Sequence, residues 1–168
     1  MINKEKVKHK ITSISLIYDI GTSCNISGDN IVQVGINLLS VIDYLESINV
    51  RVKLDIVDSY FNSNEGVGYR VTLKNYSDKL DISRMCFPLA HPSMQRRIGF
   101  RWLETYPNLV NSDYINGYGT PLDKAKRNVT DEFKRKLLNH NEHYICYYDF
   151  QDSKNLEDII KKLNLLNN

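Results

Sequence analysis

The sequence lacks an excess of charge of either sign. Across 168 residues, 22 lysines and arginines face 20 aspartates and glutamates, which gives a formal net charge of +2. This near balance argues against a dedicated nucleic-acid binder, because such proteins usually carry a strong basic excess. Long hydrophobic runs are also missing, so we expect no membrane-spanning segment. The charged N-terminus is not followed by the apolar stretch of a signal peptide.

Cysteine is scarce and scattered. Cys24, Cys86 and Cys146 are far apart in the sequence and form no CxxC pair. Their odd number and wide spacing argue against a disulfide framework and against a zinc knuckle. We therefore expect three reduced thiols in or near the core. Reduced thiols are typical of a reducing compartment, so we expect a cytoplasmic protein, in the host cell if the protein is viral.

The first half of the sequence has clear periodic patterns. Residues 11–19 are rich in β-branched and aromatic side chains and predict a strand. Apolar residues three and four apart over 31–45 predict an amphipathic helix, capped by Ser27 or Asp29. Residues 50–56 and 69–73 alternate between apolar and polar side chains, which predicts an antiparallel hairpin with charged outer faces at a sheet edge.

The second half predicts two helices, a strand and a last helix. A helix that opens at 81 should be interrupted by Pro88, and a second helix should begin at Pro92. The apolar line that we expect on this second helix consists of Met94, Ile98 and Trp102, and it is broadened by Gly99, Leu103 and Tyr106. The short apolar run 144–148 is typical of a central strand, and 156–166 is an amphipathic helix.

This order of elements predicts one domain over residues 1–168. A strand-helix-strand crossover requires parallel neighbouring strands. We therefore expect a small three-layer α/β/α Rossmann-like sheet that is mostly parallel, with one antiparallel edge hairpin.

Polar side chains follow two of the predicted strands. Asp19 ends the first strand and Asp149 follows the late strand, so both should lie at the carboxyl edge of the sheet, where α/β proteins bind ligands. With Thr22 and Ser23 they would offer oxygen ligands to Mg²⁺ or Ca²⁺. The alternative is structural: Asp19 caps a turn, and the two hydroxyls satisfy loop amides.

The segment Asp19-Ile-Gly-Thr-Ser23 resembles the metal motif Asp-x-Ser-x-Ser of von Willebrand factor A-like domains, with Gly21 in place of one serine. The resemblance covers about the first half of the chain. It implies a Rossmann-like fold used in adhesion and assembly, with Asp19 and Ser23 as metal ligands. Residues 35–45 and 87–100 also resemble an uncharacterised phage and prophage family, which implies a viral or mobile-element origin.

Basic side chains gather around 91–104. The candidate ligand-binding residues there are His91, Ser93, Arg96, Arg97 and Arg101. A helix N-terminus with several arginines suits phosphate or another anion, or a nucleic-acid backbone. The alternative is a solvated helix face with local ion pairs, such as Arg101 with Glu104.

Tyrosines are abundant in the irregular segment 107–120 and just before it. Tyr106, Tyr114 and Tyr118 would form a recognition surface for a protein partner. Equally, they would pin a long loop to the core, because tyrosine needs only one wet end.

No complete catalytic constellation is present, so we name no catalytic residue. The leading hypothesis is a non-enzymatic binding or assembly module of phage or mobile-element origin. It would recognise a protein through the 107–120 loop and the edge around Asp19. One alternative is a small Mg²⁺-dependent enzyme, or a binder of a nucleotide or phosphate ligand, at the same edge. Another is weak nucleic-acid binding through Arg96, Arg97 and Arg101.

Overall fold

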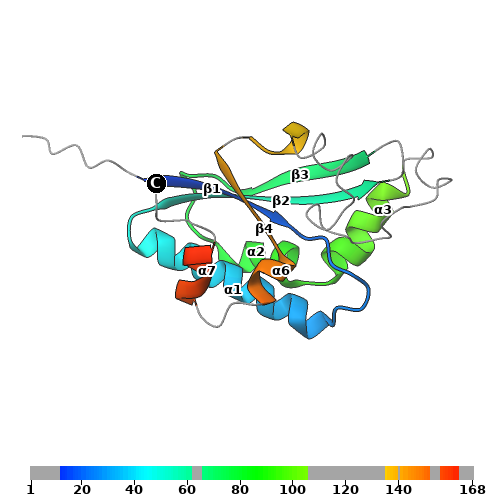
Figure 1. The fold of residues 1–168 in the computed structure, drawn as a ribbon, viewed down its shortest axis with the longest axis horizontal. Helices are drawn as coiled ribbons and strands as arrows, with labels where there is room; N and C mark the ends of the chain where they lie inside the picture. Colours follow the sequence, from blue (N-terminus) through cyan, green and yellow to red (C-terminus); the bar gives the residue numbers. More distant parts are fainter. Residues whose placement is uncertain (1–11, 62–65, 106–134, 140, 152–155, 163–168) are drawn as a thin grey trace, which may run out of the picture.

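The computed structural model describes residues 12–61, 66–105, 135–139, 141–151 and 156–162. The elements in chain order are β1 (Ser13–Asp19), α1 (Gly28–Ser47), β2 (Arg51–Phe61), β3 (Gly66–Lys74), α2 (Ile82–Ala90), the π-helix η1 (Met94–Gly99), α3 (Phe100–Leu103), β4 (Glu142–Cys146), α6 (Tyr147–Gln151) and α7 (Leu156–Lys162). Figure 1 shows how they are arranged around one twisted sheet.

The four strands form a single sheet in the order β3-β2-β1-β4. β1 lies parallel to both β2 and β4, and β3 pairs with β2 in the antiparallel direction. This confirms the predicted α/β class, with a mostly parallel sheet and one antiparallel pair. Asp19, the last residue of β1, lies opposite Val57 on β2 and Cys146 on β4.

Helix α1 confirms the strongest pattern in the sequence. Its cap is Ser27, whose side chain accepts a hydrogen bond from the Asn30 N–H at 3.2 Å. The helix ends at Ser47 with Ile48 as its C-cap, and Asn49 follows in the left-handed region with φ 64°, where asparagine is tolerated. The buried residues of α1, which face the sheet or α2, are Ile31, Val34, Gly35, Leu38, Leu39, Val41, Ile42 and Leu45.

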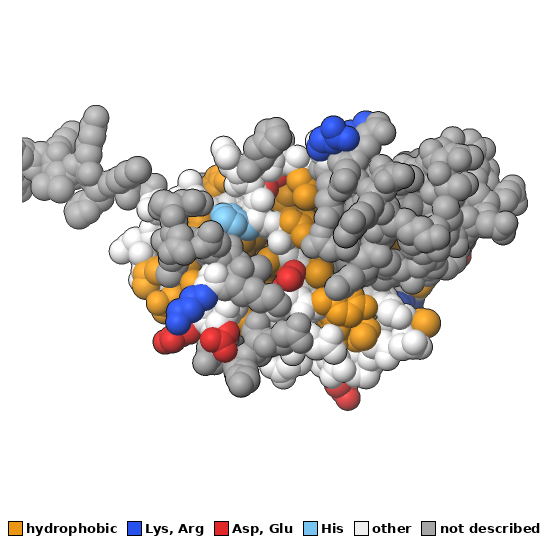
Figure 2. All heavy atoms as spheres, in the orientation of Figure 1, with side chains coloured by type: hydrophobic (Ala, Val, Ile, Leu, Met, Phe, Trp, Pro, Cys, Tyr) orange, Lys and Arg blue, Asp and Glu red, His pale blue; other side chains and the backbone are white. Residues whose placement is uncertain are grey.

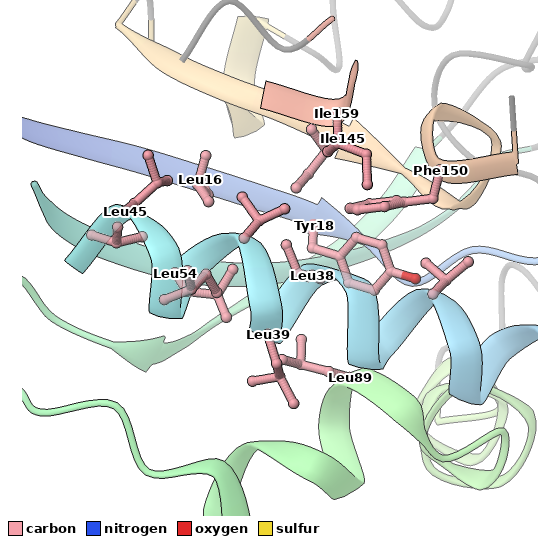
Figure 3. Packing of buried hydrophobic residues seen from close by; sticks show 14 of the residues in the cluster. Leu16, Tyr18, Leu38, Leu39, Leu45, Leu54, Leu89, Ile145, Phe150 and Ile159 are labelled. Atoms are coloured by element: carbon pink, nitrogen blue, oxygen red, sulfur yellow. The ribbon is translucent and has the colours of Figure 1, made fainter. Parts of the chain in front are cut away.

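The main core lies between the sheet and helices α1, α2, α6 and α7, which all cover one face (Figure 1). Figure 3 shows Leu16 and Tyr18 of β1 packed against Leu38 of α1, with Phe150 of α6 at the end of the cluster. On the opposite face, Ile17 and Val57 are covered by Leu137 and Leu138, and residues 135–137 form one helical turn. Any fuller third layer lies outside the described residues.

Helices α1 and α2 meet at backbone contact. A Cβ atom added to Gly35 would lie 2.6 Å from the Cβ of Ala90 and 2.8 Å from the carbonyl oxygen of Leu89. Nearer the start of α1, a Cβ at Gly28 would lie 3.3 Å from the ring of Pro92. Later residues of the α2 segment thus face earlier residues of α1, so the two helices run antiparallel.

Two predicted boundaries were wrong. Pro88 does not interrupt α2 but lies within it, since near the end of a nine-residue helix it removes only one backbone hydrogen bond. The late strand lies at 142–146 rather than 144–148, and its successor α6 includes Asp149. Asp149 accepts a hydrogen bond from the Cys146 N–H at 2.8 Å, which caps the new helix.

The charged faces of the hairpin and the cysteines also differ from expectation. Lys74 is fully buried, because the pairing of β2 with β3 shifts between Leu54 and Asp55. Val71, further along β3, is exposed. All three cysteines are free, as predicted, but only Cys146 is buried, and the other two are exposed. Among the described residues, no helix is long and apolar enough to cross a membrane.

Candidate functional site

The carboxyl edge of β1 is occupied by Asp19, whose side chain is fully buried. Its Oδ1 accepts a hydrogen bond from the Gly21 N–H at 2.8 Å, and its Oδ2 accepts one from the Tyr144 hydroxyl at 2.5 Å. Both carboxylate oxygens thus make structural hydrogen bonds. Oδ1 stabilises the turn after β1, and Oδ2 connects β1 to β4. This geometry fits the structural interpretation of Asp19.

A second buried carboxyl group, that of Asp58, lies at the same edge on β2. It accepts hydrogen bonds from the Tyr60 hydroxyl at 2.7 Å, from the Tyr69 hydroxyl at 3.5 Å and from the Ser59 N–H at 3.0 Å. Burial and the neighbouring charge of Asp19 raise the pKa of Asp58 to about 8, although these hydrogen bonds oppose the rise. Asp58 therefore holds its proton at neutral pH while Asp19 lies close by.

Asp58 was not predicted as a site residue, because the second strand was expected to end at residue 56. One signal could have found it. Val52, Leu54 and Ile56 alternate on the buried face, and Asp58 continues that alternation. A carboxylate in the phase of a core face is rare unless it is paired or protonated.

Gln95 joins the loop after β1 to the π-helix η1. Its Oε1 accepts hydrogen bonds from the Thr22 N–H at 3.2 Å and from the Thr22 hydroxyl at 2.8 Å. Gln95 and Thr22 are each 3% exposed. Among the described residues, the Gln95 Nε2 group has no hydrogen-bond partner.

One turn further along η1, Gly99 lies directly against the Asp58 carboxyl group. A Cβ atom at this position would lie 2.8 Å from Asp58 Oδ2 and 3.0 Å from the Tyr69 hydroxyl. Only glycine fits there without a shift of its neighbours. Short π-helical segments are frequent at functional sites, and this one brings Gln95 and Gly99 to the edge of β1 and β2.

The predicted metal ligands are Asp19, Ser23 and Asp149. Ser23 accepts a hydrogen bond from the Asn25 N–H at 3.5 Å, and Asp149 caps α6 instead of ending a strand. In the part of the chain that is described, no group of three or more histidine, cysteine, aspartate or glutamate residues could hold a metal ion. Mg²⁺ or Ca²⁺ binding stays a prediction. The second carboxyl group at this edge belongs to Asp58 of β2, which was not among the predicted metal ligands.

The predicted anion site is only partly assembled. Arg96 donates to the carbonyl oxygens of Ile26 at 2.6 Å and Ser23 at 3.4 Å, so it ties down the loop after β1. Arg101 pairs with Glu104 at 3.0 Å on the surface, as the ion-pair interpretation predicted. Arg97 is exposed.

His91 and Ser93 lie at the turn between α2 and η1. His91 Nδ1 accepts a hydrogen bond from the Ser93 N–H at 3.1 Å, and the imidazole stacks on Phe87 with ring centroids 5.2 Å apart. The hydroxyl of Ser93 caps no backbone N–H of η1. These two residues thus stabilise the turn between α2 and η1.

The apolar line predicted for this helix was partly wrong. Gly99 and Leu103 are buried and Met94 packs against the main core, as predicted, but Ile98 is 49% exposed and Gln95 is buried in addition. The polar side chain of Gln95 can occupy a buried position because its amide oxygen accepts a hydrogen bond from the Thr22 hydroxyl. The partner-surface candidates Tyr106, Tyr114 and Tyr118, and the 107–120 loop, lie outside the described residues.

A separate polar network crosses the opposite face of the sheet. Arg70 of β3 pairs with Asp55 of β2 and donates to both oxygens of Glu142 on β4, at 2.6 and 2.9 Å. Burial alone would raise the pKa of Glu142, but hydrogen bonds from Arg70 and Asn139 outweigh it and lower the pKa to about 2. The network ties three strands together. In Figure 2, charged side chains of the described residues are scattered over the visible face rather than gathered in one patch.

The fold and the site define a small α/β domain with a buried polar edge. The chain belongs to the family described as a domain of unknown function (DUF7192), which it matches over residues 1–167. A search of curated proteins and a search of solved structures each found no match.

Proposed function

We propose that this chain is a non-enzymatic binding module that recognises a protein partner at the carboxyl edge of its sheet. The observation that carries the proposal is the state of the two buried acids. Asp19 is engaged by Gly21 and Tyr144, and Asp58 by Tyr60 and Tyr69, so these carboxyl groups stabilise the edge instead of facing a substrate. Catalysis requires a reactive group within hydrogen-bond reach of a substrate.

The surface around this edge offers a docking platform. The loop after β1 carries the exposed residues Cys24 and Asn25, and η1 next to it carries the exposed residues Arg97 and Ile98. Arg96 ties the loop to η1, so the two segments form one pre-organised surface. A platform that is already ordered loses less entropy on binding.

The strand order supports the resemblance to von Willebrand factor A-like domains as part of this proposal. β1 ends at an aspartate and is followed by the long helix α1, and β3 is the antiparallel edge strand, the arrangement on which that resemblance rests. The proposed phage or mobile-element origin rests on the sequence resemblance alone.

Photocrosslinking from two positions tests the proposal. A benzophenone maleimide is attached to Cys24 in a Cys86→Ser background, while Cys146 is buried and stays unlabelled. The control is a Ser47→Cys protein in which both exposed cysteines are replaced by serine. Ser47 ends the 20-residue helix α1, about 30 Å from its start. We expect a crosslinked partner from Cys24 and not from Ser47→Cys, and its loss in Arg97→Glu.

Equal labelling of proteins from both positions, or labelling that survives Arg97→Glu, would count against a specific edge surface. The Mg²⁺-dependent alternative is tested in the same protein by thermal shift with Mg²⁺, Ca²⁺ and nucleotides. A stabilisation that disappears in Asp19→Asn would favour that alternative over a purely protein-binding role.

A further inference from the structure

A small pocket opens beside the polar edge, on the helical side of the sheet. It lies between the end of β1, the first turns of α1 and the α2–η1 connection, and its apolar walls include Ile20, Ile31, Leu89 and Met94. Its volume of about 10 Å³ has room for about one water molecule or the tip of one chemical group. Two polar side chains on its lining, Tyr18 and Gln95, have hydrogen-bonding capacity that no described residue uses.

The amide of Gln95 can be oriented without ambiguity. The Thr22 backbone N–H can only donate, so the Gln95 atom that it contacts must be the oxygen. The NH₂ group therefore occupies the other position, where it is buried and, within the described part of the chain, has no partner. A buried donor without an acceptor costs free energy, and an oxygen atom in the pocket would remove that cost.

Tyr18 supplies a second donor. The residue is 1% exposed, and its ring packs edge-on against Phe150, with centroids 6.4 Å apart. Its hydroxyl makes no hydrogen bond to the residues that the structure describes. Figure 3 shows this hydroxyl pointing along the core toward the start of α1. Burial, with the charge of Asp19, raises the pKa of Tyr18, so the hydroxyl keeps its proton.

We propose that this pocket is a binding subsite for a neutral carbonyl or amide oxygen carried on an apolar group. Gln95 Nε2 and the Tyr18 hydroxyl would donate to the oxygen, and the aliphatic walls would contact its apolar stem. The ligand is neutral because the charge of Asp19 lies close to Tyr18 and repels an anion. Arg96, which is tied to the neighbouring loop, donates its hydrogen bonds to the carbonyl oxygens of Ser23 and Ile26.

This subsite goes beyond the proposed protein-binding role and does not depend on it, because a small molecule and a partner's backbone carbonyl present the same group. The test uses N-methylacetamide as the neutral probe and sodium acetate as the anionic one. Each is titrated into ¹⁵N-labelled protein, and the signals of the Gln95 side-chain amide and the Thr22 backbone amide are followed. We expect saturable shifts with N-methylacetamide and much weaker ones with acetate.

Two variants separate binding from folding. Tyr18→Phe removes only the hydroxyl, and we expect it to weaken binding about fivefold or more. Its melting temperature should be unchanged or higher, because no hydrogen bond of the described protein is lost. Gln95→Glu keeps an acceptor for Thr22 and removes the donor, so binding should disappear. Tyr44→Phe, on the exposed side of α1, is the matched control and should bind as the unaltered protein does.

Three outcomes would overturn the proposal. The first is equal affinity of Tyr18→Phe for N-methylacetamide, and the second is tighter binding of acetate. The third is a long-lived water molecule in the pocket that N-methylacetamide does not displace, which would make the pocket a structural water site. Each outcome is independent of the crosslinking result, so failure of the subsite and failure of the protein-binding role are distinguishable.

Discussion

Asp58 and Gly99 are in direct contact. The Asp58 carboxyl group can occupy its position because residue 99 has no side chain. A Cβ at this position would lie 2.8 Å from Asp58 Oδ2, a distance that real Cβ atoms do not show. The carboxyl group is held in this position by hydrogen bonds from the hydroxyl groups of Tyr60 and Tyr69. The contact therefore joins the hairpin to η1.

Gly99→Ala tests this contact. We expect it to lower the free energy of unfolding by about 1 to 3 kcal/mol, the usual cost of overpacking a filled interior. The measurement is urea unfolding followed by circular dichroism. The matched control is Gly28→Ala, where the added Cβ meets only the edge of the Pro92 ring at 3.3 Å. If both substitutions had the same small effect, the Asp58 contact would not be tight.

The buried Asp58 carboxyl group should make stability depend on pH. Its pKa is about 8 in the folded protein against 3.8 as the reference value for the unfolded chain. The folded state thus binds this proton more tightly, so this contribution to the free energy of unfolding is fully present below pH 4. It is lost as the pH rises toward 8, with a slope of at most about 1.4 kcal/mol per pH unit.

Asp58→Asn keeps the shape and removes the titration. We expect the variant to lose stability relative to the unaltered protein at pH 5 and to gain relative stability at pH 8.5. Urea unfolding at four pH values between 5 and 8.5 measures the slope. Parallel curves for the two proteins would mean that Asp58 is already ionised at neutral pH.

Glu142 should act in the opposite direction at acid pH. Its pKa is lowered to about 2, so its contribution is present above the usual glutamate value and is lost as the pH falls toward 2. Glu142→Gln should cost about 1 to 3 kcal/mol at pH 7, because it weakens charged hydrogen bonds from Arg70. The difference between variant and unaltered protein should shrink toward pH 2. A cost that stays constant from pH 7 to pH 2 would falsify this account.

The ion pair between Lys74 and Glu46 should behave as a coupled unit. Lys74 is fully buried; its Nζ donates to the Val52 carbonyl at 2.9 Å and lies 2.5 Å from Glu46 Oε1, without the alignment of a hydrogen bond. Glu46→Gln leaves a buried charge without its counter-ion, so we expect a loss of about 3 kcal/mol.

Lys74→Met removes the charge itself. Combined with Glu46→Gln, it should cost less than the sum of the two single substitutions. The double-mutant cycle, measured by urea unfolding, reads this coupling directly. Additive costs would show that the two side chains do not interact in solution.

The framework of the fold was predictable because it depends on local periodicity. The α1 stripe, the alternation in β2 and the apolar run of β1 each follow from the position of a residue within its own element. The antiparallel edge followed from two alternating segments with a short polar turn between them. These signals do not require knowledge of distant contacts.

The polar edge was only half predictable. Asp19 was found because it ends a strand, whereas Asp58, Gln95 and Lys74 are polar residues in buried positions whose partners lie far away in the sequence. Thr22 and Gln95 are 73 residues apart. A shift in strand pairing at Leu54 and Asp55 decides that Lys74 points inward. Neither relationship can be predicted from residues that are neighbours in the sequence.

The contact between Gly35 and Ala90 has a consequence for selectivity. It locks α1 and α2 at backbone distance, one turn after Ile31 of α1 and directly beside Leu89 of α2, and both of these residues line the small pocket. Walls held in this way cannot move apart without separating two packed backbones. A rigid cavity selects ligands by their size first, so we expect a ligand that carries one additional methyl group not to bind.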